Sequence, residues 1–98
     1  MTNETKLLIG SLSNDLYRTA NLAFNKSNKA ATRFFMESKK WAFQIKGTDV
    51  KSYIAKIVED VKNRKDEDTS IESSETYLMY SILLQNYTLK SNKRSSSF

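Results

Sequence analysis

Hydrophobic residues recur at steps of three and four positions along most of the chain, a spacing that predicts four amphipathic helices. We expect them over residues 3–24 and 28–46, from about residue 49 to 63, and over residues 73–89. The positions predicted to face the core are Leu8, Leu12, Leu16, Thr19, Ala20 and Ala23 in the first helix, Ala31, Phe34, Phe35, Ser38, Trp41, Ala42 and Ile45 in the second, and Val50, Ile54, Ile57, Val58 and Val61 in the third. The third helix has the cleanest amphipathic pattern.

Polar residues separate the predicted helices. Ser27 or Asn28 is expected to cap the second helix by accepting a hydrogen bond from a free backbone N–H. Gly47 is expected to end that helix in the left-handed conformation, which glycine adopts without steric cost. Thr48 or Asp49 is expected to cap the third helix. The capping pairs available to the fourth helix are Thr69 with Glu72, or Ser73 with Thr76.

Four helices joined by short connections pack most simply as an antiparallel up-and-down bundle, so we predict an all-α fold. The 98 residues fit one domain, which we assign to residues 1–90. The chain contains no proline and only two glycines, which disfavours a sandwich or barrel of many short strands. Residues 91–98 are polar apart from the last and are expected to form a flexible tail.

The side chains on which most enzymes depend are scarce. There is no cysteine and no histidine, so thiolate sites and imidazole bases are excluded. Glu59 and Asp60 are adjacent and point about 100° apart on a helix, so they cannot face each other as a catalytic pair. Residues 66–68 are acidic but lack the spacing and glycine of a calcium loop, and no glycine-rich phosphate loop is present. We therefore predict a protein that is not an enzyme and binds no metal or cofactor.

The sequence also carries no pattern typical of export. The first five residues are polar, and the apolar run Leu7, Leu8 and Ile9 is too short for a signal peptide. The apolar stretch over residues 77–84 is far too short to span a bilayer. The expected location is the cytoplasm, including the inner face of the membrane.

Positive charge is concentrated in the first two thirds of the chain. Residues 6–65 hold 13 basic and 5 acidic side chains, whereas residues 66–75 hold five acids and no base. In and before the second helix, four cations fall within an arc of about 60°, with two apolar residues on its flank. These residues are Lys26, Lys29, Arg33 and Lys40, with Met36 and Phe43 beside them. They form either an ordinary solvated face or a docking surface for an acidic partner.

The fourth helix carries more apolar surface than one buried stripe requires. Leu78, Ile82, Gln85 and Leu89 line one face. Tyr80, Leu83, Leu84 and Tyr87 line a face roughly opposite. Either this helix is the most enclosed one, or the tail covers it with Phe98, or the tyrosine-rich face is an exposed binding patch. Tyrosine is enriched at interface hot spots, so we take Tyr80, Leu83, Leu84 and Tyr87 as candidate partner-binding residues.

Size, basic charge, the absence of cysteine and four amphipathic helices with a polar tail resemble the small immunity proteins that protect bacteria from their own pediocin-like bacteriocins. The matching local patterns are residues 53–57 (YIAKI) and residues 74–78 (SETYL). The resemblance implies a non-enzymatic cytosolic protein that acts at the inner membrane face, on the sugar-transport permease that serves as bacteriocin receptor. It also implies that the protein keeps the receptor–bacteriocin complex from remaining an open pore, and that the C-terminal half decides which bacteriocin is recognised.

Two other interpretations remain open. A small nucleic-acid-binding regulator would fit the sequence pI of about 9.5. Against it, the outward side of the third helix mixes Lys51 and Lys56 with Glu59, a poor lining for a DNA groove. A homodimer that buries the additional face of the fourth helix is the other alternative.

Overall fold

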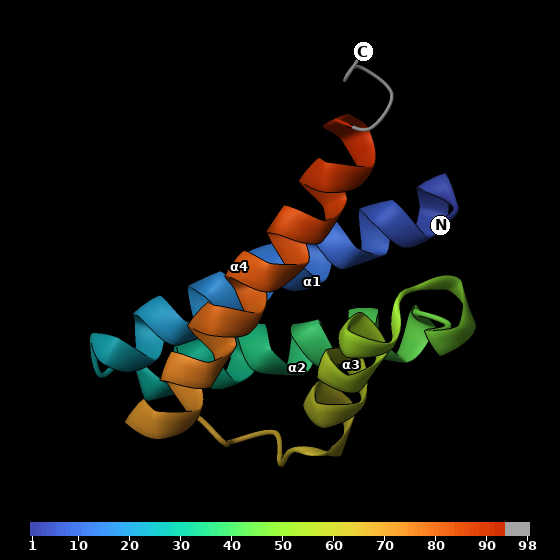
Figure 1. Cartoon of the computed structure of the whole chain (residues 1–98). Helices are drawn as coiled ribbons and strands as arrows, with labels where there is room; N and C mark the ends of the chain where they lie inside the picture. Colours follow the sequence, from blue (N-terminus) through green and yellow to red (C-terminus); the bar gives the residue numbers. More distant parts are fainter. Residues whose placement is uncertain (94–98) are drawn as a thin grey trace.

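The computed structural model describes the backbone of residues 1–93 and the side chains of residues 1–90. It contains helices α1 (Asn3–Phe24), α2 (Asn28–Gln44), α3 (Ser52–Asn63) and α4 (Ile71–Lys93), and no strand within the described residues (Figure 1). A short 3-10 helix, η1 (Gly47–Asp49), precedes α3. The predicted all-α four-helix bundle is confirmed.

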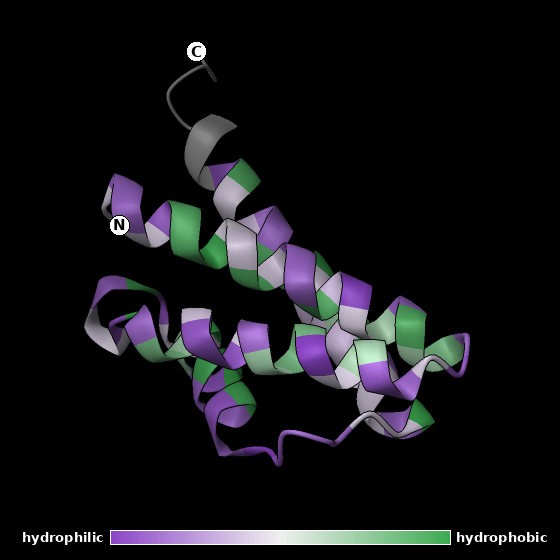
Figure 2. Ribbon diagram, turned by 180° about the vertical axis from the view of Figure 1, so that it is seen from behind, coloured by the Kyte–Doolittle hydropathy of each residue, from purple (hydrophilic) through white to green (hydrophobic). Residues whose placement is uncertain are grey.

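Helix α1 lies at the centre of the arrangement. It packs along α2 on one side and along α4 on the other, and runs antiparallel to both (Figure 1). Helix α3 is shorter, packs mainly against α2 and lies at a steep angle to it. Each helix alternates hydrophobic and hydrophilic residues at short intervals, whereas the connection from α3 to α4 is hydrophilic for most of its length (Figure 2).

The core draws on all four helices. Its members are Ile9, Leu12, Leu16, Ala20, Phe35, Ala42, Ile45, Ile54, Ile57, Val58, Val61, Tyr77 and Leu84. Most positions predicted for the first three helices are buried, but Leu8, Phe34, Trp41 and Val50 are only partly buried. Small residues let α1 approach α4 closely: the Ser13 hydroxyl donates a 2.8 Å hydrogen bond to the Ser81 carbonyl.

Both ends of α1 are hydrogen-bonded. The Thr2 hydroxyl caps the start by accepting a 3.1 Å hydrogen bond from the Thr5 amide. At the end, the Lys26 amide donates to the Ala23 carbonyl and the Ser27 amide donates to the Leu22 carbonyl. This is the Schellman pattern, and Lys26 takes the left-handed position in it, with a φ of 61°.

The connection from α2 to α3 differs from the prediction. Helix α2 already ends at Gln44, and Gly47 has no positive φ, so its expected left-handed role is wrong. Neither Thr48 nor Asp49 caps α3, because both lie in η1 and Lys51 precedes α3 directly. The Asp49 carboxylate instead accepts a 3.2 Å hydrogen bond from the Thr2 amide, joining this connection to the start of α1.

The start of α4 also differs from the prediction. The Ser70 hydroxyl accepts a 3.1 Å hydrogen bond from the Ser73 amide, so Ser70 caps the helix in place of either expected pair. The start of α2 also differs from the prediction, because the Ser27 side chain makes no capping hydrogen bond. Helix α4 continues to Lys93, three residues into the segment predicted as a tail. The remaining tail residues, including Phe98, lie outside the described residues.

Candidate interaction surfaces

The outer face of α2 presents cations to solvent. Lys29, Arg33 and Lys40 are exposed and, at 100° per residue, fall within an arc of about 40°. Within the described side chains none of the three forms a salt bridge. Their charge is therefore available to an anionic partner. We call Lys29, Arg33, Met36, Lys40 and Phe43 the α2 face.

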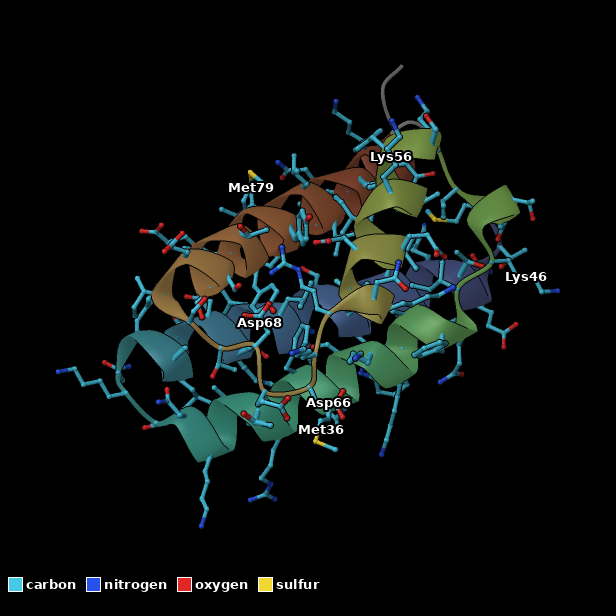
Figure 3. All side chains as sticks on the ribbon, turned by 90° about the horizontal axis from the view of Figure 1, so that it is seen from below. Met36, Lys46, Lys56, Asp66, Asp68 and Met79 are labelled. Carbon is cyan, nitrogen blue, oxygen red and sulfur yellow. The ribbon has the colours of Figure 1, made fainter. Side chains whose placement is uncertain are left out.

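Hydrophobic side chains border these cations. Met36 is 45% exposed and Phe43 is 65% exposed, so no neighbouring helix covers either one. Met36 points away from the bundle (Figure 3). The Lys62 Nζ lies 5.5 Å from the centre of the Phe43 ring, in a cation–π contact, and is itself paired with the Glu59 carboxylate at 3.0 Å.

Lys26 lies outside α2. The sequence interpretation placed it on the same stripe as Lys29, but α2 begins only at Asn28. Lys26 is exposed in the turn before the helix, where its backbone is left-handed. Helical spacing therefore does not align Lys26 with the other three cations.

A shallow pocket opens beside the α2 face. It has a volume of about 230 Å³ and is lined by Ala30, Arg33, Phe34 and Glu37. Small-molecule sites usually enclose about 300–1,000 Å³, so this depression is too small to indicate a ligand site.

A buried carboxyl group lies between α1 and α2. Asp15 is 3% exposed, accepts a 2.7 Å hydrogen bond from the Trp41 indole and lies 3.5 Å from the Arg18 guanidinium. Burial, together with the nearby Glu37 carboxyl, raises the pKa of Asp15 to about 6. We call Asp15, Arg18, Glu37 and Trp41 the Asp15 cluster. Its central carboxyl group is buried and therefore closed to substrate.

The predicted binding patch on α4 is not an exposed face. Leu84 is completely buried in the core, so its expected place on the surface is wrong. Tyr80 and Tyr87 are partly buried, and their hydroxyls are engaged. Tyr80 donates to the Asp60 carboxylate at 2.6 Å, and Tyr87 accepts from the Lys51 amide at 3.2 Å. Of the predicted four, Leu83 is exposed, at 37%.

Tyr80 belongs to a polar network that joins α3 to α4. We call Asp60, Arg64, Asp68, Ser73, Tyr77 and Tyr80 the Arg64 cluster. The Arg64 guanidinium bonds to Asp60 at 2.9 Å, to Asp68 at 3.1 Å and to the Ser73 hydroxyl at 3.0 Å. It also lies 5.2 Å from the centre of the Tyr77 ring. Burial and the Asp60 carboxylate together raise the pKa of Tyr80. The Ser73 and Tyr80 hydroxyls therefore join α4 to Arg64 and Asp60 within the fold.

The connection from α3 to α4 is anchored by a second cation. Lys39 on α2 pairs with Asp66 at 2.9 Å and also donates to the Arg64 carbonyl. Asp66 and Asp68 both lie on this connection (Figure 3). The acidic segment of this connection is thus held against α2 and α4.

The exposed surface of α4 lies elsewhere. Met79 and Ile82 are each 51% exposed, Leu89 is 44% exposed, and Met79 points away from the bundle on the side opposite to Met36 (Figure 3). We call Met79, Ile82, Leu83 and Leu89 the α4 strip. Sequence reasoning missed Met79. The interleaved pairs Ser74–Ser81 and Tyr77–Leu84, each seven residues apart, mark the buried side and could have placed Met79 outside.

The described residues contain neither a metal-binding cluster nor a membrane-spanning helix. Among them, no three acidic side chains come close enough together to hold a metal ion. Within the same residues, every helix is too short or too polar to cross a bilayer. No protein-family model, curated protein or solved structure matches the chain.

Proposed function

We propose that this protein is a bacteriocin immunity protein, a non-enzymatic binder that protects the producing cell at the inner face of its membrane. Its target would be the complex of a bacteriocin with its receptor permease. The observation that carries the proposal is the α2 face, where three exposed cations, none in a salt bridge with a described side chain, lie beside exposed Met36 and Phe43. The resemblance in size, charge and helix pattern supplies the biological context.

The two kinds of side chain on the α2 face have different roles in such binding. Cations speed the approach to an anionic surface and orient the protein on it, but an exposed charge adds little affinity alone. Burial of Phe43 against a partner would contribute on the order of 1–2 kcal/mol, since about two thirds of the side chain is still open to water. A surface that combines the two can bind both the charged membrane surface and an apolar segment of a permease.

Protection from a bacteriocin tests the proposal directly. A sensitive strain that expresses the wild-type protein is challenged with a panel of pediocin-like bacteriocins, and the minimum inhibitory concentration is measured. We expect the wild type to raise it for at least one bacteriocin. The variant Lys29→Gln/Arg33→Gln/Lys40→Gln should lose most of that protection, by about tenfold in inhibitory concentration.

The matched control is Lys46→Gln/Lys56→Gln/Lys65→Gln. It removes the same three charges from exposed side chains outside the α2 face, and Lys46 and Lys56 both point into solvent (Figure 3). Protection should survive in the control. If the wild type protects from no bacteriocin, the function is wrong. If both variants lose protection equally, net charge is responsible and the α2 face is not the binding surface.

A further inference from the structure

Two residues of the α4 strip, Met79 and Leu83, lie between opposite charges on one line of the α4 surface. Glu72, Met79, Leu83 and Lys90 are all exposed and, at 100° per residue, fall within an arc of about 40°. Glu72 lies in the first turn of α4 and Lys90 near its end. Along one line of the helix surface the order is therefore acid, two apolar side chains, base.

This order is complementary to itself when a second copy runs in the opposite direction. Glu72 and Lys90 are each nine residues from Ser81, and Met79 and Leu83 are each two residues from it. A two-fold axis at the level of Ser81 places Glu72 opposite Lys90 of the second copy, about 14 Å from the axis along the helix. The same axis places Met79 opposite Leu83. A parallel pair would instead place like charges together.

A groove between α3 and α4 provides room for the Met79 side chain of the second copy. It has a volume of about 300 Å³ and is lined by Tyr53, Leu83, Asn86, Tyr87, Leu89 and Lys90. Met79 of a second copy would reach the Leu83 edge of this groove. An unbranched thioether chain adapts well to an irregular gap of this kind.

We infer that the protein forms an antiparallel homodimer through the line of Met79 and Leu83 on α4, with two equivalent contacts between Glu72 and Lys90. The α2 face lies on the other side of the bundle and stays free in the dimer (Figure 3). The contact is one helix wide and therefore small, so we expect a dissociation constant on the order of 100 µM. The inference does not depend on the proposed function.

Sedimentation equilibrium over a wide range of protein concentration tests the dimer. The mass should rise from 11.3 kDa toward twice that value. Met79→Glu should weaken dimerisation by about tenfold or more, because it places a charge at the apolar centre of the contact. Leu7→Glu is the control, since Leu7 is 73% exposed on α1, outside the strip. It should leave the dimer unchanged.

Charge exchange tests the direction of the helices. Glu72→Lys alone and Lys90→Glu alone should each weaken the dimer, because each places two like charges opposite each other. An equimolar mixture of the two variants should restore it, since both contacts of the mixed dimer then join opposite charges. Circular dichroism of each variant checks that it is folded. A wild type that stays monomeric overturns the inference. So does a dimer unaffected by Met79→Glu, or a mixture without rescue.

Discussion

Two polar clusters lie within the bundle, and they differ in the charges that they bring together. The Arg64 cluster joins one guanidinium to two carboxylates and two phenol rings. The Asp15 cluster buries one carboxyl beside a second carboxyl, offset in part by the Trp41 hydrogen bond and by the exposed Arg18. In the first, folding satisfies each charged group. In the second, folding makes ionisation of Asp15 harder, so the cluster stabilises the fold least when that group is charged.

The difference follows from where the clusters lie. The Arg64 cluster is at the α3–α4 junction, where helix ends and a polar connection supply several hydrogen-bonding partners. The Asp15 cluster lies between the middle of α1 and α2, where the backbone groups already bond within the helices. There the Trp41 indole is the donor nearest to the carboxyl, at 2.7 Å. Removal of the Arg64 guanidinium should therefore destabilise the fold, whereas removal of the Asp15 charge should stabilise it.

The largest effect is expected from Arg64→Ala. The substitution leaves Asp60 and Asp68 partly buried without their cation and removes the contact over Tyr77. We expect a loss of about 2–4 kcal/mol in the free energy of unfolding, measured by urea denaturation. Arg64→Lys keeps the charge but cannot reach all its partners, so its loss should be intermediate. A change below about 0.5 kcal/mol in Arg64→Ala would show that the network adds no net stability.

Asp15→Asn should change the free energy of unfolding in the opposite direction and stabilise the protein at neutral pH. The amide can still accept the Trp41 hydrogen bond but carries no charge. Because the folded pKa of Asp15 is raised to about 6 from 3.8, the folded wild type binds the proton more tightly than the unfolded chain does. Wild-type stability should therefore fall as pH rises from about 4 to about 6.

The variant lacks that loss, so it should be more stable than the wild type at pH 7 by about 1–3 kcal/mol. Asp49, whose pKa is lowered by hydrogen bonds from Thr5 and Thr2, titrates below this range. The difference between the two unfolding curves, taken at each pH, isolates Asp15. If that difference does not change between pH 4 and pH 7, the buried carboxyl does not titrate as described.

The parts of the molecule that could be predicted from the sequence are those set by local spacing. Hydrophobic spacing is local information, and it predicted all four helices, the bounds of α1 and most of the core. Helix ends depended on single hydrogen bonds that several residues could have made. Ser70 rather than Thr69 caps α4, and Gly47 lies in η1 rather than in a left-handed turn.

The surface of α4 required information that the spacing lacks. Its pattern contains apolar residues on nearly every side, so it does not indicate which side meets α1. The buried side is instead marked by Ser74 and Ser81, whose small size permits close packing. The hydroxyl of Tyr80 bonds to a carboxylate 20 residues earlier, a long-range contact that no local pattern predicts. On α2 one broad polar side leaves little ambiguity, so Met36 and Phe43 lie on the predicted flank.

The smallest effect is expected from Tyr80→Phe, which decides whether Tyr80 belongs to the Arg64 cluster or to a binding surface. Loss of the 2.6 Å hydrogen bond to Asp60 should lower the free energy of unfolding by about 1 kcal/mol, since Arg64 still pairs with that carboxylate. Tyr17→Phe is the control, because Tyr17 is 52% exposed and its hydroxyl forms no hydrogen bond within the described residues. The control should unfold like the wild type. Equal stability of all three proteins would remove Tyr80 from the cluster and return its hydroxyl to the surface as a group available to a partner.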